Sequence, residues 1–320
     1  MEPVSGTTEA RSETAEQRKM TLGLLPGLDE NGHDGATPRY KTIQRMAQEA
    51  EDAGLDTFWL ADHFFYEEAP DKPRIGQWEA FTFLSALAAA TSRIQLGPMV
   101  AATSFRNPAL LAKMADSLDE ISDGRFILGV GAGWHQPEYD CFGYPFDHRV
   151  ARFEEALQVI TPLLREGEVD FTGQYYSARN CTLNPRGPTK AGPQILIGAR
   201  QPRMLHLVAR YADAWNTAWH VKPEVVAERW AQMRAICAEV GRNPATLELT
   251  AGVSLRVMLP GEAAPEPSER HITGTPEQVA EALHGFAAVG ARNLIAVIEP
   301  ERADNAKRLG RVKALLDRAC

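Results

Sequence analysis

The sequence predicts an α/β protein of the (β/α)8 TIM barrel class. From Thr21 onward, short apolar runs alternate with amphipathic stretches, which is the pattern of βα units around a parallel sheet. Eight such runs can be counted, and eight is the number of strands in this barrel. Several runs, such as Phe126-Ile127-Leu128, are continuously apolar, as expected of strands covered on both faces. The expected strands are residues 22–25, 57–61, 94–100, 126–130, 194–197, 214–217, 247–257 and 293–298.

The helices between these strands have start and stop signals. Thr37 before Pro38 predicts the beginning of the first helix, and Gly54 lies just past its expected end. Asn107 before Pro108 opens the third helix in the same way. Residues 275–278 (Thr-Pro-Glu-Gln) predict a capping box, in which the Thr and Gln side chains satisfy each other's backbone N–H groups.

Two insertions interrupt the simple repeat, one after the fourth strand and one after the seventh. Residues 169–176 alternate around Thr172-Gly173-Gln174 and predict a small hairpin. Residues 260–267, with three prolines and Gly261, predict a mobile loop. Residues 1–19 are rich in Glu, Thr, Ser and Arg, and we expect them to form a disordered N-terminal tail before a single domain at 20–320.

Composition limits the classes of function. The chain has 320 residues, 44% of them hydrophobic, and a formal charge of −8. Its basic residues are scattered, so nucleic acid is not an expected partner. The four cysteines form no CxxC pair and no HExxH motif occurs, so neither a metal site nor a disulfide framework is expected. No run reaches the ~20 apolar residues of a membrane helix, and we expect a cytoplasmic protein.

Active sites of (β/α)8 enzymes lie at the carboxyl ends of the strands. The second expected strand is followed by Asp62 and His63. An imidazole can exchange a proton near neutral pH, so His63 is the candidate catalytic acid or base. A structural histidine bonded to backbone is the alternative. Asp62 could orient His63, or it could form a turn or a helix cap.

The third and fourth strands end in small residues. Met99, Val100 and Ala101 close the third strand and could leave room for a planar ring, although tight packing explains small residues equally well. The fourth strand runs into Gly-Val-Gly-Ala-Gly-Trp-His at 129–135. Trp134 stands where a GxGxxG fingerprint needs its third glycine, so a Rossmann fold is not indicated. Gly133 permits a tight turn that would place Trp134 and His135 over the barrel mouth.

After the fifth strand, Gly198, Ala199 and Arg200 lead into a helix. Its free N–H groups and the positive end of its dipole could bind a cofactor phosphate. Arg200 could pair with that phosphate, or it could lie exposed to solvent at the helix start.

In combination, these motifs resemble the luciferase-like monooxygenase superfamily, and within it the branch of oxidoreductases that use coenzyme F-420, a deazaflavin. The resemblance runs from Thr21 to about Asn216 and resumes more weakly at GTPEQV. Its segments are ADHF, SFRNPALLAK, LDEISDGRFILGVGAGW, FGYPF followed by RFEEALQVI, FTGQYY, and ILIGA followed by LVARYADAWN.

The resemblance implies a barrel with the cofactor ring at its mouth, in a homodimer. It implies that His63 lies near the reactive carbon. Taken with the strand ends described above, the expected cofactor contacts are Asp62, Met99, Val100, Ala101, Gly133, Trp134, Gly198, Ala199 and Arg200. It further implies a non-prolyl cis peptide between Met99 and Val100.

The sequence shows three departures from the pattern of this branch. Ala199 and Arg200 replace part of a glycine-rich run, Ala101 replaces a threonine, and Trp134 replaces the acidic residue of the sugar-phosphate dehydrogenases. The Trp134 departure argues against a sugar phosphate as the substrate.

Three functions are compatible with the sequence. The first is hydride transfer between coenzyme F-420 and a small organic substrate. The second is an FMN-dependent monooxygenase that uses reduced flavin and oxygen. The third is a protein that binds a flavin without turnover. The fold is common to all of them and does not decide between them.

Overall fold

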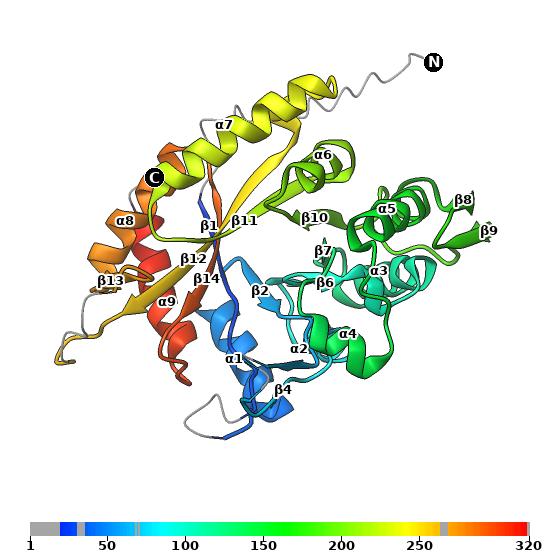
Figure 1. The fold of residues 1–320 in the computed structure, drawn as a ribbon. Helices are drawn as coiled ribbons and strands as arrows, with labels where there is room; N and C mark the ends of the chain where they lie inside the picture. The colour runs from blue at the N-terminus through cyan, green and yellow to red at the C-terminus, as the bar shows by residue number, and fades with distance from the viewer. Residues whose placement is uncertain (1–19, 31–35, 68, 70, 263–267, 319–320) are drawn as a thin grey trace, which may run out of the picture.

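Eight parallel strands form a barrel with helices around it (Figure 1). The computed structural model describes residues 20–30, 36–67, 69, 71–262 and 268–318. The order of neighbouring strands in the sheet is β5-β2-β1-β14-β12-β11-β10-β7-β6. The segments β5 and β6 are two halves of the third barrel strand: β5 pairs with β2, and β6 pairs with β7. The sheet therefore closes through residues 95–102.

Each of the eight expected strands is present, which confirms the predicted (β/α)8 class. In barrel order they are β1 (Thr21–Leu24), β2 (Thr57–Leu60), β5 (Gln95–Pro98) with β6 (Ala101–Ala102), β7 (Ile127–Gly131), β10 (Gln194–Gly198), β11 (Ala214–His220), β12 (Glu248–Val257) and β14 (Asn293–Ile298).

The helices follow the strands as expected of βα units. They are α1 (Tyr40–Asp52), α2 (Ala80–Ala90), α3 (Pro108–Ser122), α4 (Gln136–Phe142), α5 (Arg149–Glu166), α6 (Pro202–Tyr211), α7 (Pro223–Glu239), α8 (Pro276–Ala288) and α9 (Asn305–Leu316), with short 3-10 turns η1 (Thr103–Phe105) and η2 (Pro244–Thr246). None of the helices within the described residues is long and apolar enough to cross a membrane.

Two of the three predicted helix starts are confirmed. The Asn107 side chain accepts hydrogen bonds from the first turn of α3, and Thr275 forms the predicted capping box with Gln278. The predicted start at Thr37 and Pro38 is wrong, because α1 begins at Tyr40. The Trp78 indole donates a hydrogen bond to the Pro38 carbonyl oxygen at 2.8 Å, so a tertiary contact engages this segment before the helix begins.

The insertion after the fourth barrel strand contains the predicted hairpin. Strands β8 (Glu168–Thr172) and β9 (Ser177–Thr182) pair antiparallel beside α5, at the outer edge of the molecule (Figure 1). After the seventh barrel strand, β13 (Ile272–Gly274) adds to β12 in parallel. Residues 263–267 of the predicted mobile loop at 260–267 lie outside the described residues. The whole predicted tail, residues 1–19, also lies outside them. A further small hairpin, β3 (Phe65–Tyr66) with β4 (Ile75–Gly76), follows β2.

Side chains inside the barrel form a compact core of their own. Trp59, Ile127, Leu196, Ala214 and Ile295 are buried together there. They come from five different strands, and each has neighbours in sequence on the opposite face, as the period-2 geometry of a strand requires. The Trp59 indole fits because β5 has Gly97 beside it: an added Cβ at Gly97 would lie 2.8 Å from the indole.

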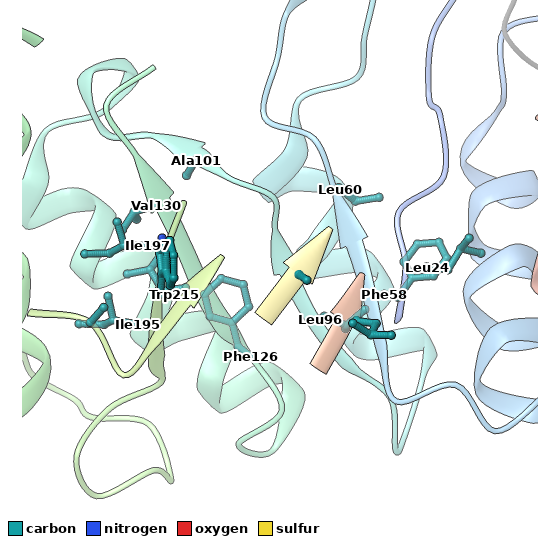
Figure 2. Close-up of a cluster of buried hydrophobic side chains, with 14 of the residues drawn as sticks. Leu24, Phe58, Leu60, Leu96, Ala101, Phe126, Val130, Ile195, Ile197 and Trp215 are labelled. Atoms are coloured by element: carbon teal, nitrogen blue, oxygen red, sulfur yellow. The ribbon is translucent and has the colours of Figure 1, made fainter. Parts of the chain in front are cut away.

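A larger apolar layer lies between the barrel and its helices. Figure 2 shows part of it, with Leu24 and Phe58 beside each other on β1 and β2, and with Ile195 and Ile197 on β10. These residues alternate in sequence with the inward-facing ones. Burial of both faces explains why the strands read as continuous apolar runs.

Candidate active site

A cavity of about 600 Å³ lies at the carboxyl ends of the barrel strands. Residues at or after the ends of β2, β5, β6, β7 and β10 line it, together with residues within β11 and residues from the first turns of α4, α5 and α6. This is the end of a (β/α)8 barrel at which active sites form. The cavity brings together most of the site residues predicted from the sequence.

His63 lies in the cavity wall and pairs with a buried carboxylate. Its Nδ1 lies 2.8 Å from Oε2 of Glu138, and the two side chains are 15% and 1% exposed. The second oxygen of Glu138 accepts hydrogen bonds from the backbone N–H groups of Phe64 and Phe65, at 2.5 and 3.3 Å. Glu138 therefore fixes both the ring and the turn on which the ring is placed.

Asp62 has a different partner. Its carboxylate accepts two hydrogen bonds from the Arg106 guanidinium, at 2.7 and 2.9 Å, and one from the backbone N–H of Ala102, at 3.1 Å. Arg106 also donates to Glu79, which caps α2. The predicted roles of Asp62 were an orienting contact to His63, a turn or a helix cap; its hydrogen bonds go instead to Ala102 and Arg106, 40 and 44 positions away. Asp62 instead links the end of β2 to the turn after β6.

The third barrel strand is interrupted at the cavity floor. The peptide between Met99 and Val100 is cis, as predicted. Both residues line the cavity, and the Val100 side chain lies against Gly131 and Gly198. Ala101 does not face the cavity; it is fully buried in the layer between barrel and helices, and Ala102 lines the cavity in its place. The alternation of side chains along a strand accounts for this difference.

Trp134 lies at the rim. Its side chain is 63% exposed, and its indole meets the His63 ring edge to face at 5.5 Å between centroids. Gly133 and Trp134 both line the cavity. The prediction that His135 lies over the barrel mouth is wrong, because His135 is 6% exposed and does not line the cavity. Its Nε2 accepts a hydrogen bond from the backbone N–H of Glu67.

Two arginines line the cavity at the starts of helices. Gly198, Ala199 and Arg200 line it, and α6 begins two residues later. Arg149, the first residue of α5, lines the same cavity; its guanidinium donates a hydrogen bond to the Gly133 carbonyl oxygen and lies over the Phe146 ring. Two basic residues and two helix starts therefore border one space, an arrangement that can bind an anionic group such as a phosphate.

A buried histidine lies close to this charge. His220 is 6% exposed and shares a hydrogen bond of 2.9 Å with the Thr217 hydroxyl. Burial, together with the nearby positive charges of Arg229 and Arg200, lowers the pKa of His220 to about 4. His220 is thus neutral near pH 7, and the guanidinium groups supply the positive charge at this end.

The sequence alone did not identify Glu138, Arg149 or Trp219. Glu138 lies in the first turn of α4, where an acidic residue is favoured by the helix dipole, and this position was its only local signal. Arg149 opens α5 without a side-chain cap. Trp219 follows the predicted end of the sixth strand, which extends to His220 in the structure. Its position in the cavity wall depends on the three-dimensional structure and has no local signal in the sequence.

The chain is similar in sequence to a known oxidoreductase. A ketoreductase of Mycobacterium bovis that acts on phthiodiolone and phenolphthiodiolone dimycocerosates is 31% identical over 211 residues, which are 61% of this chain and 55% of that protein. The chain therefore spans just over half the length of this relative.

Two solved structures share the fold. The coenzyme F-420-dependent tetrahydromethanopterin reductase of Methanopyrus kandleri has a TM-score of 0.75 at 19% identity, over 92% of this chain and 98% of that one. The EDTA monooxygenase of Chelativorans sp. BNC1 has a TM-score of 0.77 at 16% identity, over 94% of each chain.

The family model of luciferase-like monooxygenases matches residues 20–288, which include seven of the eight barrel strands and the whole cavity lining. Its members among the similar proteins are oxidoreductases and monooxygenases. The chain belongs to the luciferase-like monooxygenase family.

Proposed function

We propose that this protein is a coenzyme F-420-dependent oxidoreductase that transfers a hydride to or from a small organic substrate. The observation that carries the proposal is the pairing of His63 with Glu138 in the wall of the cavity. Reduction of a polar double bond such as a carbonyl requires a hydride at carbon and a proton at oxygen. A histidine placed at the mouth of the barrel can supply that proton.

Glu138 determines which nitrogen of His63 is available. Because the carboxylate takes Nδ1, Nε2 is the nitrogen that can exchange a proton with a ligand. Two backbone N–H groups hold the carboxylate in turn, so the ring orientation is defined before a ligand binds. In the reductive direction, the imidazolium form of His63, protonated at both nitrogens, would donate its Nε2 proton to the substrate oxygen as the carbon–oxygen π bond is lost, which leaves a neutral ring bonded to Glu138 through Nδ1–H.

The residues present fit a deazaflavin. Arg149, Arg200 and the first turns of α5 and α6 would hold an anionic group of the cofactor. Val100, Gly131 and Gly198 leave an apolar floor: an added Cβ at Gly131 would lie 2.8 Å from the Val100 side chain. When bound, the cofactor would supply or accept the hydride. Met99 and Gly133 complete the proposed cofactor surface.

A flavin monooxygenase needs a pocket that excludes water from its reactive intermediate, whereas hydride transfer from a deazaflavin does not use oxygen. The His63–Glu138 pair, which can exchange a proton with a carbonyl or alcohol oxygen, is the observation that favours hydride transfer. The FMN monooxygenase and the flavin-binding protein without turnover are the alternatives that experiment would reveal.

The test is the replacement of His63 by alanine. We expect His63→Ala to lower turnover at least a hundredfold and to leave coenzyme F-420 binding within about twofold of the native value. Turnover would be followed as loss of the oxidised deazaflavin's visible absorbance with a panel of secondary alcohols from 2-butanol to 1-phenylethanol. Cofactor binding would be followed by fluorescence titration.

The matched control is His206→Ala. His206 also pairs with a glutamate, since its Nε2 lies 3.1 Å from Glu239, but the pair is on the surface of α6 and α7 and not in the cavity. Turnover in this variant should be unchanged. Native-like turnover of His63→Ala would remove His63 from the mechanism, and turnover only with FMN and oxygen would replace the proposal by the monooxygenase.

A further inference from the structure

Two large aromatic side chains at the cavity mouth are left open to solvent. Trp134 is 63% exposed and Trp219 is 46% exposed, and both line the cavity. Single exposed apolar residues on a protein surface need no explanation. Two exposed indoles on one cavity, one of them beside the candidate proton donor His63, indicate a ligand that covers them.

Trp134 is held beside His63 by other rings. Its indole lies 5.5 Å from the His63 ring at an interplanar angle of 72°, and 6.4 Å from the Tyr66 ring at 30°. These distances and angles are within the range of favourable aromatic pairs. The indole is therefore positioned by its neighbours even though most of its surface is exposed.

The Trp219 ring packs against a glycine in the neighbouring strand. It is in β11, and an added Cβ at Gly252 of β12 would lie 2.6 Å from the Trp219 ring. No side chain other than glycine fits beneath this indole without moving it. The ring position is thus determined by the barrel wall, and its other surface contributes to the cavity.

The two indoles flank the proposed anion site. Trp134 follows β7, Trp219 is in β11, and β10, which carries the loop at 198–201, pairs with both strands. The loop at 198–201 therefore follows a strand that lies between the strands from which the two indoles extend.

The charges around the cavity leave little to attract an ionic substrate. Its ionisable residues include Asp62, His63, Glu138, Arg149 and Arg200. Arg106 neutralises Asp62, and Glu138 is bonded to His63. The two remaining arginines are at the helix N-termini, where the proposed cofactor anion would use them. The uncharged part of the lining has the amides of Gln201 and Asn216 and the rings and aliphatic groups of Phe105, Tyr139, Val150 and Met204.

Building on the proposed function, we propose that the substrate is an uncharged aromatic carbonyl compound, or the corresponding secondary alcohol, whose planar ring is bound by Trp134 and Trp219. Its oxygen would face His63. In the reductive direction, the carbonyl carbon gains the hydride from the reduced deazaflavin, the oxygen gains the proton from His63, and the cofactor is oxidised. Aromatic rings contribute both large apolar area and specific ring geometry to such a contact.

The test compares two ketones of similar size and different ring character. Acetophenone and cyclohexyl methyl ketone would be titrated against the protein saturated with coenzyme F-420, by calorimetry. We expect the native protein to bind acetophenone at least fivefold more tightly. The variants Trp134→Ala and Trp219→Ala should each weaken acetophenone binding about tenfold, while Trp134→Phe should recover most of it.

The matched control is Trp78→Ala. Trp78 is similarly exposed, at 43%, but it lies outside the cavity and stacks on Phe83. Acetophenone binding should not change in this variant. Equal affinity for the two ketones, or native affinity in both tryptophan variants, would overturn the proposal.

A separate titration distinguishes failure of this inference from failure of the proposed function. If the native protein does not bind coenzyme F-420, the proposed function fails. The same ketone titrations on cofactor-free and FMN-loaded protein then decide whether the indoles bind an aromatic ring. If the cofactor binds but acetophenone does not, the proposed function stands and the substrate class is wrong.

Discussion

At the scale of single residues, the proposed chemistry depends on the orientation of one imidazole ring. His63 is bonded at Nδ1 to Glu138, which is 1% exposed and is itself held by two backbone N–H groups. A buried carboxylate of this kind acts on catalysis through the histidine it orients. Glu138 is therefore a positioning residue, and its replacement should affect turnover more than cofactor binding.

We expect Glu138→Gln to lower kcat by about 10- to 100-fold while the dissociation constant of coenzyme F-420 changes less than about twofold. The amide can still occupy the same volume but can no longer accept hydrogen bonds at both positions. Steady-state kinetics and fluorescence titration would measure the two quantities. Glu239→Gln, which alters the surface pair with His206, is the control. An unchanged kcat in Glu138→Gln would contradict the orienting role.

Glu301 gives the protein a titration that stability measurements can detect. Burial raises the pKa of Glu301 to about 7, from 4.5, although a hydrogen bond from the Gly27 backbone opposes the shift. Between these two pH values the folded state binds more protons than the unfolded state. Glu301 therefore contributes to the stability of the folded state most strongly below pH 4.5. This contribution is lost as the pH rises through 7.

Glu301→Gln should remove this dependence. Urea unfolding at pH 5 and pH 8 would show a smaller fall in unfolding free energy for the variant than for the native protein, by a difference of the order of 2 kcal/mol. Parallel pH profiles for the two proteins would show that Glu301 titrates normally in the folded state.

At the scale of elements, the third barrel strand connects the fold to the site. Its first half, β5, packs under the barrel core, and its second half leads to the turn that Arg106 ties to Asp62. The cavity floor at Met99 and Val100 lies between these halves. Anything that displaces β5 should therefore disturb both stability and the cavity.

Gly97→Ala tests this connection. An added Cβ would lie 2.5 Å from the Ile127 carbonyl oxygen and 2.8 Å from the Trp59 ring, both of which are in packed strands. We expect a loss of about 2 to 4 kcal/mol in unfolding free energy, measured by urea denaturation. Gly27→Ala is the control, because its nearest neighbour would be 3.4 Å away. Similar stabilities for the two variants would contradict the packing described for β5.

The elements themselves were predictable because their signals are local. The eight apolar runs, the Asn107 cap and the Thr275 capping box depend on residues within a few positions of each other, and all are present. The start of α1 was not predictable, since it depends on a hydrogen bond between Trp78 and Pro38 across 40 positions. Glu138 was missed for the same reason: its contact with His63 spans 75 positions and depends on how α4 packs.

At the scale of the whole molecule, the barrel collects groups from distant parts of the chain at one end. The proton donor follows β2, the positive groups begin α5 and follow β10, and the exposed indoles follow β7 and lie near the end of β11. The sequence located the candidate residues after each strand because the carboxyl ends of parallel strands meet at one end of a barrel. It could not show that the cavity joins them, since its shape depends on long-range packing.

The most direct test of the central claim is a pair of fluorescence titrations of the purified protein, one with coenzyme F-420 and one with FMN. The proposed hydride-transfer function predicts that coenzyme F-420 binds at least tenfold more tightly than FMN. It also predicts that Arg149→Ala and Arg200→Ala each weaken that binding, because both guanidinium groups line the cavity. Tighter binding of FMN, or no binding of either cofactor, would contradict it.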